Sequence, residues 1–299
     1  MRLSVYRYED GKIMTLIQQK EVVGLAGYIK KKIMEIKGIH KACDVLLRFK
    51  EIANRFAEAK DIHIFATASL RGIHNQDEAL KIIQEDTGFL PEVLSGEEEA
   101  RLGFIGASHF NEFENGILID IGGASTELVR FENSQPVQLA SIPVGCLNLY
   151  AKFVGKVIPT GKESKKIKTE IRERFDAVDW DFEEKFPLMV GVGGTARAVQ
   201  KLSRDLYSLP DNAMIFEMSY LPHFVADADW IRSGLSLGTI PPEVISAIVA
   251  FLRFLIGGAM RIDSNSGNCN SDTYSFPFTF ANNISTALSA AGFILFDTI

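Results

Sequence analysis

Two glycine-containing loops in this 299-residue sequence combine residue types suited to binding phosphate. The first is Asp120-Ile121-Gly122-Gly123-Ala124-Ser125-Thr126-Glu127, which follows an apolar segment. Its adjacent glycines, Gly122 and Gly123, allow a tight turn that presents backbone N–H groups to an anion, and the hydroxyls of Ser125 and Thr126 add donors. Asp120 repels phosphate, so a Mg²⁺ ion bound between Asp120 and the phosphate would explain why an acid stands in this loop. Glu127 could then assist through a water in the outer shell of the ion. By itself, the loop is equally compatible with an ordinary hairpin turn.

The second loop is Gly191-Val192-Gly193-Gly194-Thr195, again placed after an apolar segment and before a helical pattern. A helix that begins here offers unpaired N–H groups and the positive end of its dipole to a phosphate. Gly193, Gly194 and Thr195 are therefore candidate phosphate-binding residues. Tight packing between strand and helix is the alternative for this loop, and the presence of two such loops makes that alternative weaker for both.

A run of three carboxylates, Glu97-Glu98-Glu99, stands at the start of a predicted helix. Ser95 precedes Glu98 at the spacing of a helix capping box, and acids in a first helical turn complement the dipole. Successive residues of a helix are rotated by about 100°, so the three acids cannot share one environment. One of them can point inward and act as a general base for water.

Arg71 ends the segment Ala66-Thr67-Ala68-Ser69-Leu70-Arg71, which follows a short buried strand and is otherwise poor in charge. A guanidinium group in this place can bind phosphate oxygens through two parallel hydrogen bonds. A structural ion pair is the alternative.

The elements that must position these residues alternate between strand and helix, which predicts an α/β protein. The pattern occurs twice and predicts two domains, 1–110 and 111–299, with the boundary near 107–116. The first set comprises a hairpin (3–8 with 12–17), a helix over 41–60, a strand over 61–67, a helix over 76–87, a strand over 91–94 and a helix over 97–106. The second comprises strands over 116–120, 127–131 and 137–142, a helix over 162–175, a strand over 188–192, a helix over 196–206 and a closing helix over 281–296.

Composition narrows the classes of partner. The formal net charge is −6, which does not favour broad attraction to nucleic acid or to an anionic membrane. The most apolar stretch, 244–260, contains Arg253 and a glycine pair and is expected to be a buried helix. Cys43, Cys146 and Cys269 lack metal-ligand spacing and are expected to be reduced thiols, and with no signal peptide at the start the sequence predicts a cytoplasmic protein.

Taken together and in this order, the four segments resemble the exopolyphosphatase and guanosine pentaphosphate phosphohydrolase family of the actin-like ATPase superfamily. Ser141-Ile142-Pro143-Val144-Gly145 is a fifth match. The resemblance implies two ribonuclease-H-like domains with the active site in a cleft between them, and a last helix that packs back on the first domain. It also implies Mg²⁺-assisted attack of water on a terminal phosphoryl group of polyphosphate or of a phosphorylated guanine nucleotide, with a homodimer possible.

Residue by residue, the resemblance implies Glu99 as the water-activating acid and Arg71 as a phosphate-binding arginine. Asp120 and Glu127 match the acids on the metal side. The glycine loop between these two acids matches the family's phosphate loop.

The sequence departs from the family pattern in three places. Relatives open with a strand and a first phosphate loop, Asp-x-Gly-Ser-Asn, before an Arg-Leu pair; here Arg2-Leu3 follows Met1 directly, so the first domain is expected to lack its opening strand. Gly24 stands where an arginine is usual, and the segment after 263 fits poorly. These departures leave open a non-catalytic sensor of a phosphorylated guanine nucleotide. A kinase of the same superfamily is disfavoured, because a kinase has no need of a water-activating acid at Glu99.

A basic helix, 162–174, is compatible with two interpretations. Its lysines and arginines could guide a polyanion. The commoner case is a solvated face with pairs such as Lys166 with Glu170 and Glu170 with Arg174.

Overall fold

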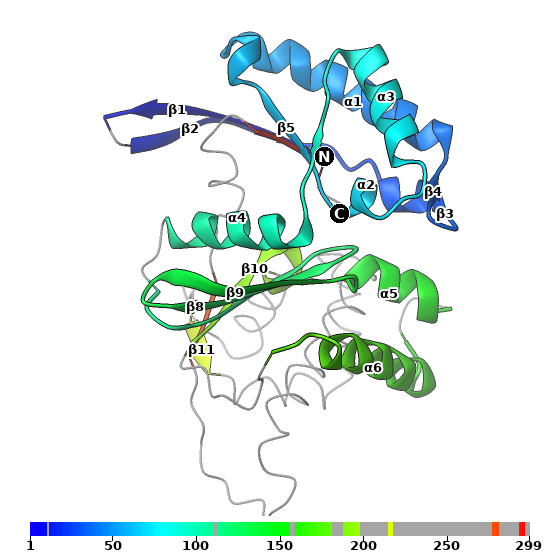
Figure 1. Cartoon of the computed structure of the whole chain (residues 1–299), viewed down its shortest axis with the longest axis vertical. Helices are drawn as coiled ribbons and strands as arrows, with labels where there is room; N and C mark the ends of the chain where they lie inside the picture. Colours follow the sequence, from blue (N-terminus) through cyan, green and yellow to red (C-terminus); the bar gives the residue numbers. More distant parts are fainter. Residues whose placement is uncertain are drawn as a thin grey trace, which may run out of the picture. The chain divides into compact units, whose positions relative to one another are not determined.

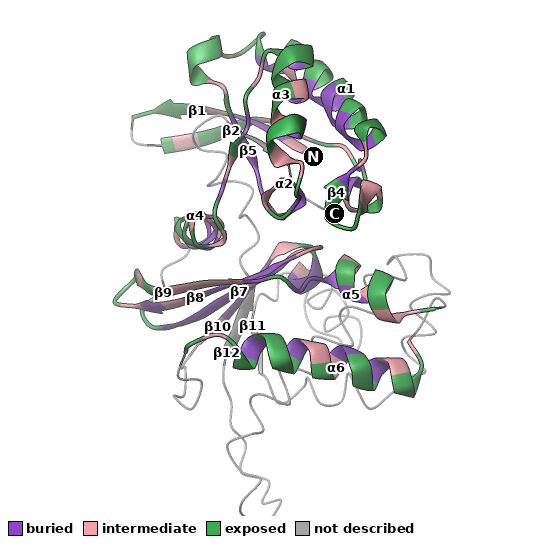
Figure 2. Cartoon of the chain, turned by 45° about the vertical axis from the view of Figure 1, so that its right-hand side comes forward, coloured by how far each residue is buried: buried purple, intermediate pink, exposed green. Residues whose placement is uncertain are grey.

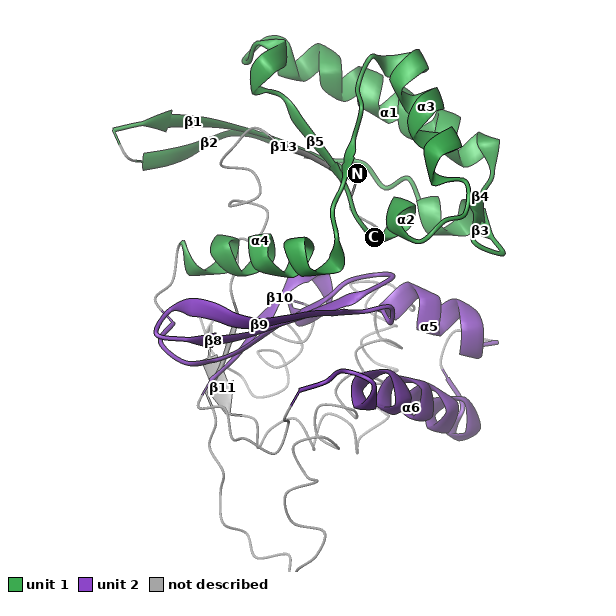
Figure 3. Ribbon diagram, viewed as in Figure 1, with its two compact units in different colours: residues 1–111, 283–299 green, residues 112–282 purple. Residues whose placement is uncertain are grey.

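The computed structural model describes residues 1–10, 12–109, 113–155, 159–180 and 188–197, together with three strands, 215–217, 277–280 and 293–296. The chain separates into two compact units: unit 1 contains residues 1–111 and 283–299, and unit 2 contains residues 112–282 (Figure 3). Of the predicted helix over 196–206, only residues 196 and 197 are described, and both are helical. Residues 198–206 and the apolar stretch 244–260 lie outside the described residues.

Unit 1 is built on a five-stranded sheet in the order β2-β1-β13-β5-β6. The hairpin expected at the N-terminus is confirmed, since β1 and β2 pair antiparallel with a bulge between Val5 and Tyr6. β13 pairs antiparallel with β1 and parallel with β5, and β5 is parallel to β6. The strands are β1 (Arg2–Glu9), β2 (Lys12–Lys20), β5 (His63–Ala66), β6 (Glu92–Val93) and β13 (Phe293–Phe296).

The predicted closing helix over 281–296 is wrong at its C-terminal end. Phe293–Phe296 is strand β13, which occupies the centre of the unit 1 sheet, and 281–292 lie outside the described residues. The physical reason lies in the Phe-Ile-Leu-Phe run. A short apolar run rich in aromatic and branched residues suits a strand paired on both edges, and periodicity alone does not distinguish it from a buried helix.

Helix α1 (Ile36–Ala53) covers the sheet of unit 1 with the face formed by Ile39, Cys43, Leu46 and Phe49, all buried. It packs against α3 (Gln76–Thr87), and the two helices lie side by side in Figure 1. α3 has the predicted bounds, whereas α1 begins and ends earlier than the predicted 41–60. The remaining elements of the unit are η1 (Leu25–Tyr28), β3 (Ile29–Lys30), β4 (Ile33–Met34), η2 (Ala59–Asp61), α2 (Ala68–Arg71) and α4 (Gly96–Ser108).

The predicted capping box at the start of α4 is confirmed. The Ser95 hydroxyl accepts a hydrogen bond from the backbone N–H of Glu98 at 3.1 Å, and the Glu98 carboxylate accepts from the backbone N–H of Ser95 at 3.2 Å. The first N–H groups of a helix have no partner within the helix, and the side chains of Ser95 and Glu98 supply acceptors at this end of α4. The box fixes the residue at which α4 begins and therefore the rotation of every side chain on it.

We expect Ser95→Ala to lower the free energy of unfolding by about 1 kcal/mol, because the first turn of α4 loses its cap. Urea unfolding followed by circular dichroism measures this change. Ser108→Ala, at the other end of the same helix, removes a hydroxyl that donates only to the carbonyl of Ile105 and serves as the control. An equal loss in both variants would show that the cap has no special role.

Unit 2 is built on a six-stranded sheet in the order β11-β12-β10-β7-β8-β9. β7, β8 and β9 are antiparallel neighbours, and β7, β10 and β12 are parallel. The central strands of the two units thus have the same surroundings: β7 and β13 each have an antiparallel hairpin on one side and parallel strands on the other. The strands are β7 (Gly116–Ile121), β8 (Thr126–Glu132), β9 (Gln135–Ile142), β10 (Met189–Val192), β11 (Ile215–Glu217) and β12 (Pro277–Phe280).

Besides a short helix over 193–197 that follows β10 directly, the described part of unit 2 contains α5 (Cys146–Phe153) and α6 (Gly161–Asp176). The buried side of α6 repeats every three or four residues, visible as the purple stripe in Figure 2 and formed by Ser164, Ile167, Ile171 and Phe175. Beside this stripe, the predicted pair of Glu170 with Arg174 is present at 3.1 Å, and the second oxygen of Glu170 binds Lys152 at 2.7 Å. The hydrogen bond from Lys152 is the main cause that lowers the pKa of Glu170.

Among the described residues, no helix has both the length and the apolar character needed to cross a membrane.

Candidate functional site

Unit 1 brings two of the candidate residues together, Arg71 and Glu99. Arg71 is the last residue of α2, which follows β5 directly, and Glu99 lies in the first turn of α4. The Arg71 Nη1 donates to Glu99 Oε2 at 2.7 Å and to the carbonyl of Leu94 at 3.1 Å. Both side chains keep about a fifth of their surface exposed, 23% and 20%. The pair is therefore a charge-assisted hydrogen bond that still reaches solvent.

The three carboxylates at the start of α4 have three different environments, as the helical rotation predicts. Glu98 is engaged in the capping box, Glu97 is exposed, and Glu99 meets Arg71. The geometry singles out Glu99 as the acid of this run that lies beside a cation.

In unit 2, the glycine loop is the turn between β7 and β8. The N–H of Gly122 donates to the carbonyl of Ser125 at 3.0 Å, which closes the turn. The loop carbonyls point at the start of α5: Gly122 accepts from the N–H of Cys146 at 2.9 Å, and Gly123 accepts from Leu147 at 2.8 Å. Within the described residues, the N–H groups of Gly123 and Ala124 donate to no protein group. These two amides are available to an anion, as a phosphate nest requires.

The acids at the two ends of this loop, Asp120 and Glu127, are direct partners in the β7–β8 ladder. Partners in a ladder project to the same face of the sheet with Cβ atoms about 4.5–5.5 Å apart, and like charges in these positions destabilise the sheet. Glu127 is buried, and its Oε1 accepts from the hydroxyl of Ser141 at 2.8 Å. Two carboxylates on one face of the sheet beside a phosphate nest are suited to hold a divalent cation.

The second glycine loop lies against Asp120. Val192 is the parallel partner of Asp120 between β10 and β7, and the next residue, Gly193, has φ 84°. A Cβ atom at Gly193 would overlap Oδ1 of Asp120, so only glycine fits there. The buried Thr195 hydroxyl donates to the carbonyl of Ile121 at 3.0 Å, which ties the start of the 193–197 helix to β7.

Unit 2 therefore gathers most of the candidate residues around the C-terminal end of β7. They come from the first loop, from its flanking acids and from the second loop: Asp120, Gly122, Gly123, Ser125, Thr126, Glu127, Gly193, Gly194 and Thr195. Ser125 and Thr126 are buried, and the hydroxyl of Thr126 donates to the carbonyl of Val144 at 2.6 Å, so it is committed to holding the loop. Arg71 and Glu99 belong to unit 1.

Asn148 is a residue that the sequence analysis missed. Its Oδ1 accepts from the N–H of Gly145 at 2.9 Å, and its Nδ2 donates to the carbonyl of Ala124 at 2.8 Å. Gly145 itself packs so closely on Gly123 and Ala124 that a side chain there would overlap the loop backbone. The three-residue spacing of Gly145 and Asn148, which is that of a capping box, is the signal that could have revealed this contact.

We expect Asn148→Ala to loosen the glycine loop, because the loop loses a side-chain hydrogen bond to Ala124. Hydrogen exchange of the amides in 121–126 should become faster, with a loss of about 1 kcal/mol in the free energy of unfolding. Asn115→Ala is the matched control, since Asn115 makes a comparable bond to the N–H of Asn133 at the other end of the β7–β8 hairpin. Exchange in 121–126 that is unchanged in Asn148→Ala would contradict this role.

Neither described cysteine is suited to act as a nucleophile. Cys43 and Cys146 are both buried, and both are thiols rather than halves of a disulfide. Burial, aided by the neighbouring Asp86, raises the pKa of Cys43 to about 12, so its thiolate is scarce at neutral pH.

Comparison with known proteins identifies relatives along most of the chain. The sequence profile of the Ppx/GppA phosphatase family matches residues 4–210. A guanosine-5'-triphosphate,3'-diphosphate pyrophosphatase of Vibrio parahaemolyticus serotype O3:K6 is 30% identical over 281 residues, which cover 86% of this chain and 54% of the relative. A protein of the same name from Vibrio vulnificus is 30% identical over 207 residues, covering 66% and 40%. The chain thus spans about half the length of these relatives.

Solved structures share the fold. A Ppx/GppA family member of Aquifex aeolicus superimposes with a TM-score of 0.72 over 97% of this chain and 92% of its own, at 16% identity. An exopolyphosphatase of Cytophaga hutchinsonii gives a TM-score of 0.75 over 97% and 96%, also at 16% identity. At this level of identity the similarity concerns the fold alone.

Proposed function

The chain belongs to the Ppx/GppA phosphatase family, and from this premise we propose that it hydrolyses a terminal phosphoanhydride bond of inorganic polyphosphate or of guanosine pentaphosphate. The observation that carries the proposal is the pair of acids, Asp120 and Glu127, which are ladder partners at the ends of a loop whose amides at Gly123 and Ala124 are available to an anion. Positioning and charge neutralisation are the main requirements of phosphoryl transfer.

The donor set of unit 2 fits Mg²⁺. Asp120 and Glu127 offer only oxygen ligands, and Mg²⁺ in phosphate-processing sites is usually held by one or two carboxylates together with phosphate oxygens and waters. We propose that Asp120 contacts the ion and that Glu127, held by Ser141, acts through a water. When bound, the ion neutralises phosphate charge and polarises the phosphoryl oxygens.

The chain's own residues account for the rest of the proposed mechanism. The amides of Gly123 and Ala124, with the second loop at Gly193, Gly194 and Thr195, hold phosphate oxygens. Arg71 binds the terminal phosphate, and Glu99 accepts a proton from the attacking water. A base in this role has to lie within hydrogen-bond reach of the water, and Arg71 fixes the carboxylate of Glu99 at 2.7 Å from its own Nη1.

We further propose that units 1 and 2 are the two ribonuclease-H-like domains of an actin-like fold. The matching order of strands around β13 and β7 supports this proposal.

The proposal is tested by measuring phosphate release by the full chain, with and without Mg²⁺, from long-chain polyphosphate and from guanosine pentaphosphate. We expect Mg²⁺-dependent release from at least one of them. Binding of either compound without release would instead identify a sensor of phosphorylated ligands. The absence of both binding and release would reject the proposal.

A further inference from the structure

The hairpin of β3 and β4 carries an unusual turn. Ile29 pairs with Met34 and Lys30 with Ile33, which leaves only Lys31 and Lys32 to connect the two strands. Both lysines have left-handed backbone conformations, with φ 49° and 61°. Two-residue turns of this kind favour Asn-Gly or Asp-Gly, because a side chain with a Cβ atom is disfavoured at positive φ. Two lysines therefore occupy the turn against local backbone preference, which indicates a role for their side chains.

The hairpin is fastened to the loop that follows Arg71. The N–H of His74 donates to the carbonyl of Lys32 at 2.6 Å. The amide side chain of Asn75 makes two bonds to the backbone of Met34, accepting from its N–H at 2.9 Å and donating to its carbonyl at 3.0 Å. Three hydrogen bonds thus hold the turn in a fixed position relative to the Arg71 loop.

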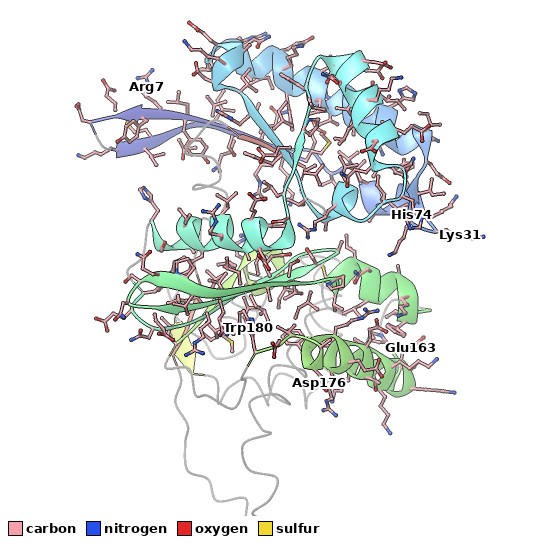
Figure 4. All side chains as sticks on the ribbon, in the orientation of Figure 1. Arg7, Lys31, His74, Glu163, Asp176 and Trp180 are labelled. Atoms are coloured by element: carbon pink, nitrogen blue, oxygen red, sulfur yellow. The ribbon has the colours of Figure 1, made fainter. Side chains whose placement is uncertain are left out.

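The turn concentrates positive charge in a chain whose net charge is −6. Lys30, Lys31 and Lys32 are all exposed, and Figure 4 shows Lys31 at the same end of unit 1 as His74. Lys30 is paired with Glu35. Within the described residues, Lys31 and Lys32 make no ion pair, so their charges are available to a ligand.

The distance between this turn and Arg71 is limited by the chain itself. His74 is the third residue after Arg71, and an extended chain over three residue steps spans at most about 11 Å. His74 is in turn hydrogen-bonded to Lys32. A chain of phosphates carries a negative charge on every unit and can extend over such a distance, so one polyphosphate chain can reach both Arg71 and the turn.

We propose that the Lys31–Lys32 turn is an outer subsite that binds the distal phosphates of a polyphosphate chain whose terminal phosphate is held by Arg71. The inference rests on the proposed function and extends it, because it selects inorganic polyphosphate as the substrate class. Exposed ammonium groups act as point charges, so the contribution of this subsite falls as salt screens them.

The test replaces the turn by Asn-Gly in the full chain, with the double variant Lys31→Asn, Lys32→Gly. This change removes both charges and supplies the residues that the turn prefers, so misfolding of the hairpin does not explain a loss. The matched control is Lys60→Gln, Lys81→Gln, which removes two exposed lysine charges elsewhere in unit 1. KM is measured for long-chain polyphosphate and for tripolyphosphate at low and high salt.

For Lys31→Asn, Lys32→Gly we expect the preference for long over short chains, expressed as the ratio of the two KM values, to fall roughly tenfold at low salt. The control double variant should keep the wild-type ratio. An unchanged ratio in the turn variant, or an equal fall in the control, would overturn the subsite. Retention of long-chain polyphosphate by the protein in a gel-shift assay gives a second readout that needs no turnover.

The two assays distinguish the failure of this inference from the failure of the proposed function. If the wild type releases phosphate and the two double variants have the same ratio of KM values, the subsite is rejected and the hydrolase function stands. Without any release, the proposed hydrolase function fails, and weaker retention of long chains by the turn variant alone would still support the subsite. Release from guanosine pentaphosphate without retention of polyphosphate would reject the subsite and leave the hydrolase function standing.

Discussion

Replacement of Glu99 by glutamine is expected to lower kcat for phosphate release by roughly 10²–10⁴-fold, with little change in KM. Glutamine has the shape of glutamate and keeps an oxygen that can accept the 2.7 Å hydrogen bond from Arg71. The local structure around Arg71 should therefore persist, while the basic group that receives the proton of water is lost. Steady-state kinetics with Mg²⁺ and polyphosphate measures the effect.

The neighbouring acids provide the controls for this prediction. Glu97→Gln changes an exposed side chain and should retain wild-type kcat. Glu98→Gln weakens the capping box and should lower the melting temperature without a fall in kcat measured well below that temperature. If Glu99 served only to orient Arg71, Glu99→Gln would keep kcat, and that result would remove Glu99 from the proposed mechanism.

Local sequence rules identified the elements around Glu99 because each depends on nearby residues. The spacing of Ser95 and Glu98 predicted the start of α4, and the helical rotation then predicted different environments for the three acids. The β7–β8 hairpin was likewise predictable from an apolar run, a glycine pair and a second apolar run. In both cases the residues that determine the structure lie within a few positions of one another.

The features that the sequence could not reveal depend on contacts between distant segments. The predicted start of α1 at Lys41 was late because glycine inside a helix is unfavourable by about 1 kcal/mol relative to alanine. In the structure Gly38 belongs to the helix, and a Cβ atom there would meet the side chain of Tyr28. The packing of Gly145 on Gly123 and the insertion of β13 between β1 and β5 are contacts of the same kind. No local pattern specifies which distant segment will be the partner.

The second large effect is expected for Gly193→Ala. The added methyl group meets Oδ1 of Asp120, and alanine is disfavoured at the φ of 84° that Gly193 adopts. Relief of the overlap requires the carboxylate or the loop to move. Because misplacement of a catalytic group by about 1 Å can cost roughly 100-fold in rate, we expect a loss of that size in phosphate release, together with a higher Mg²⁺ concentration for half-maximal activity.

Gly161→Ala separates this effect from a general response of unit 2 to the added methyl group. Gly161 is the first residue of α6, its φ is not positive, and a Cβ atom there would meet nothing within 4 Å. This variant should keep wild-type activity and Mg²⁺ dependence. Asp120→Asn replaces the same carboxylate by a neutral amide, so it should share the altered Mg²⁺ dependence of Gly193→Ala. Gly193→Ala would contradict this prediction if it folds and retains both the wild-type rate and the wild-type Mg²⁺ dependence. The carboxylate of Asp120 would then not need the position that the second glycine loop gives it, and the proposed metal role of Asp120 would lose its structural basis.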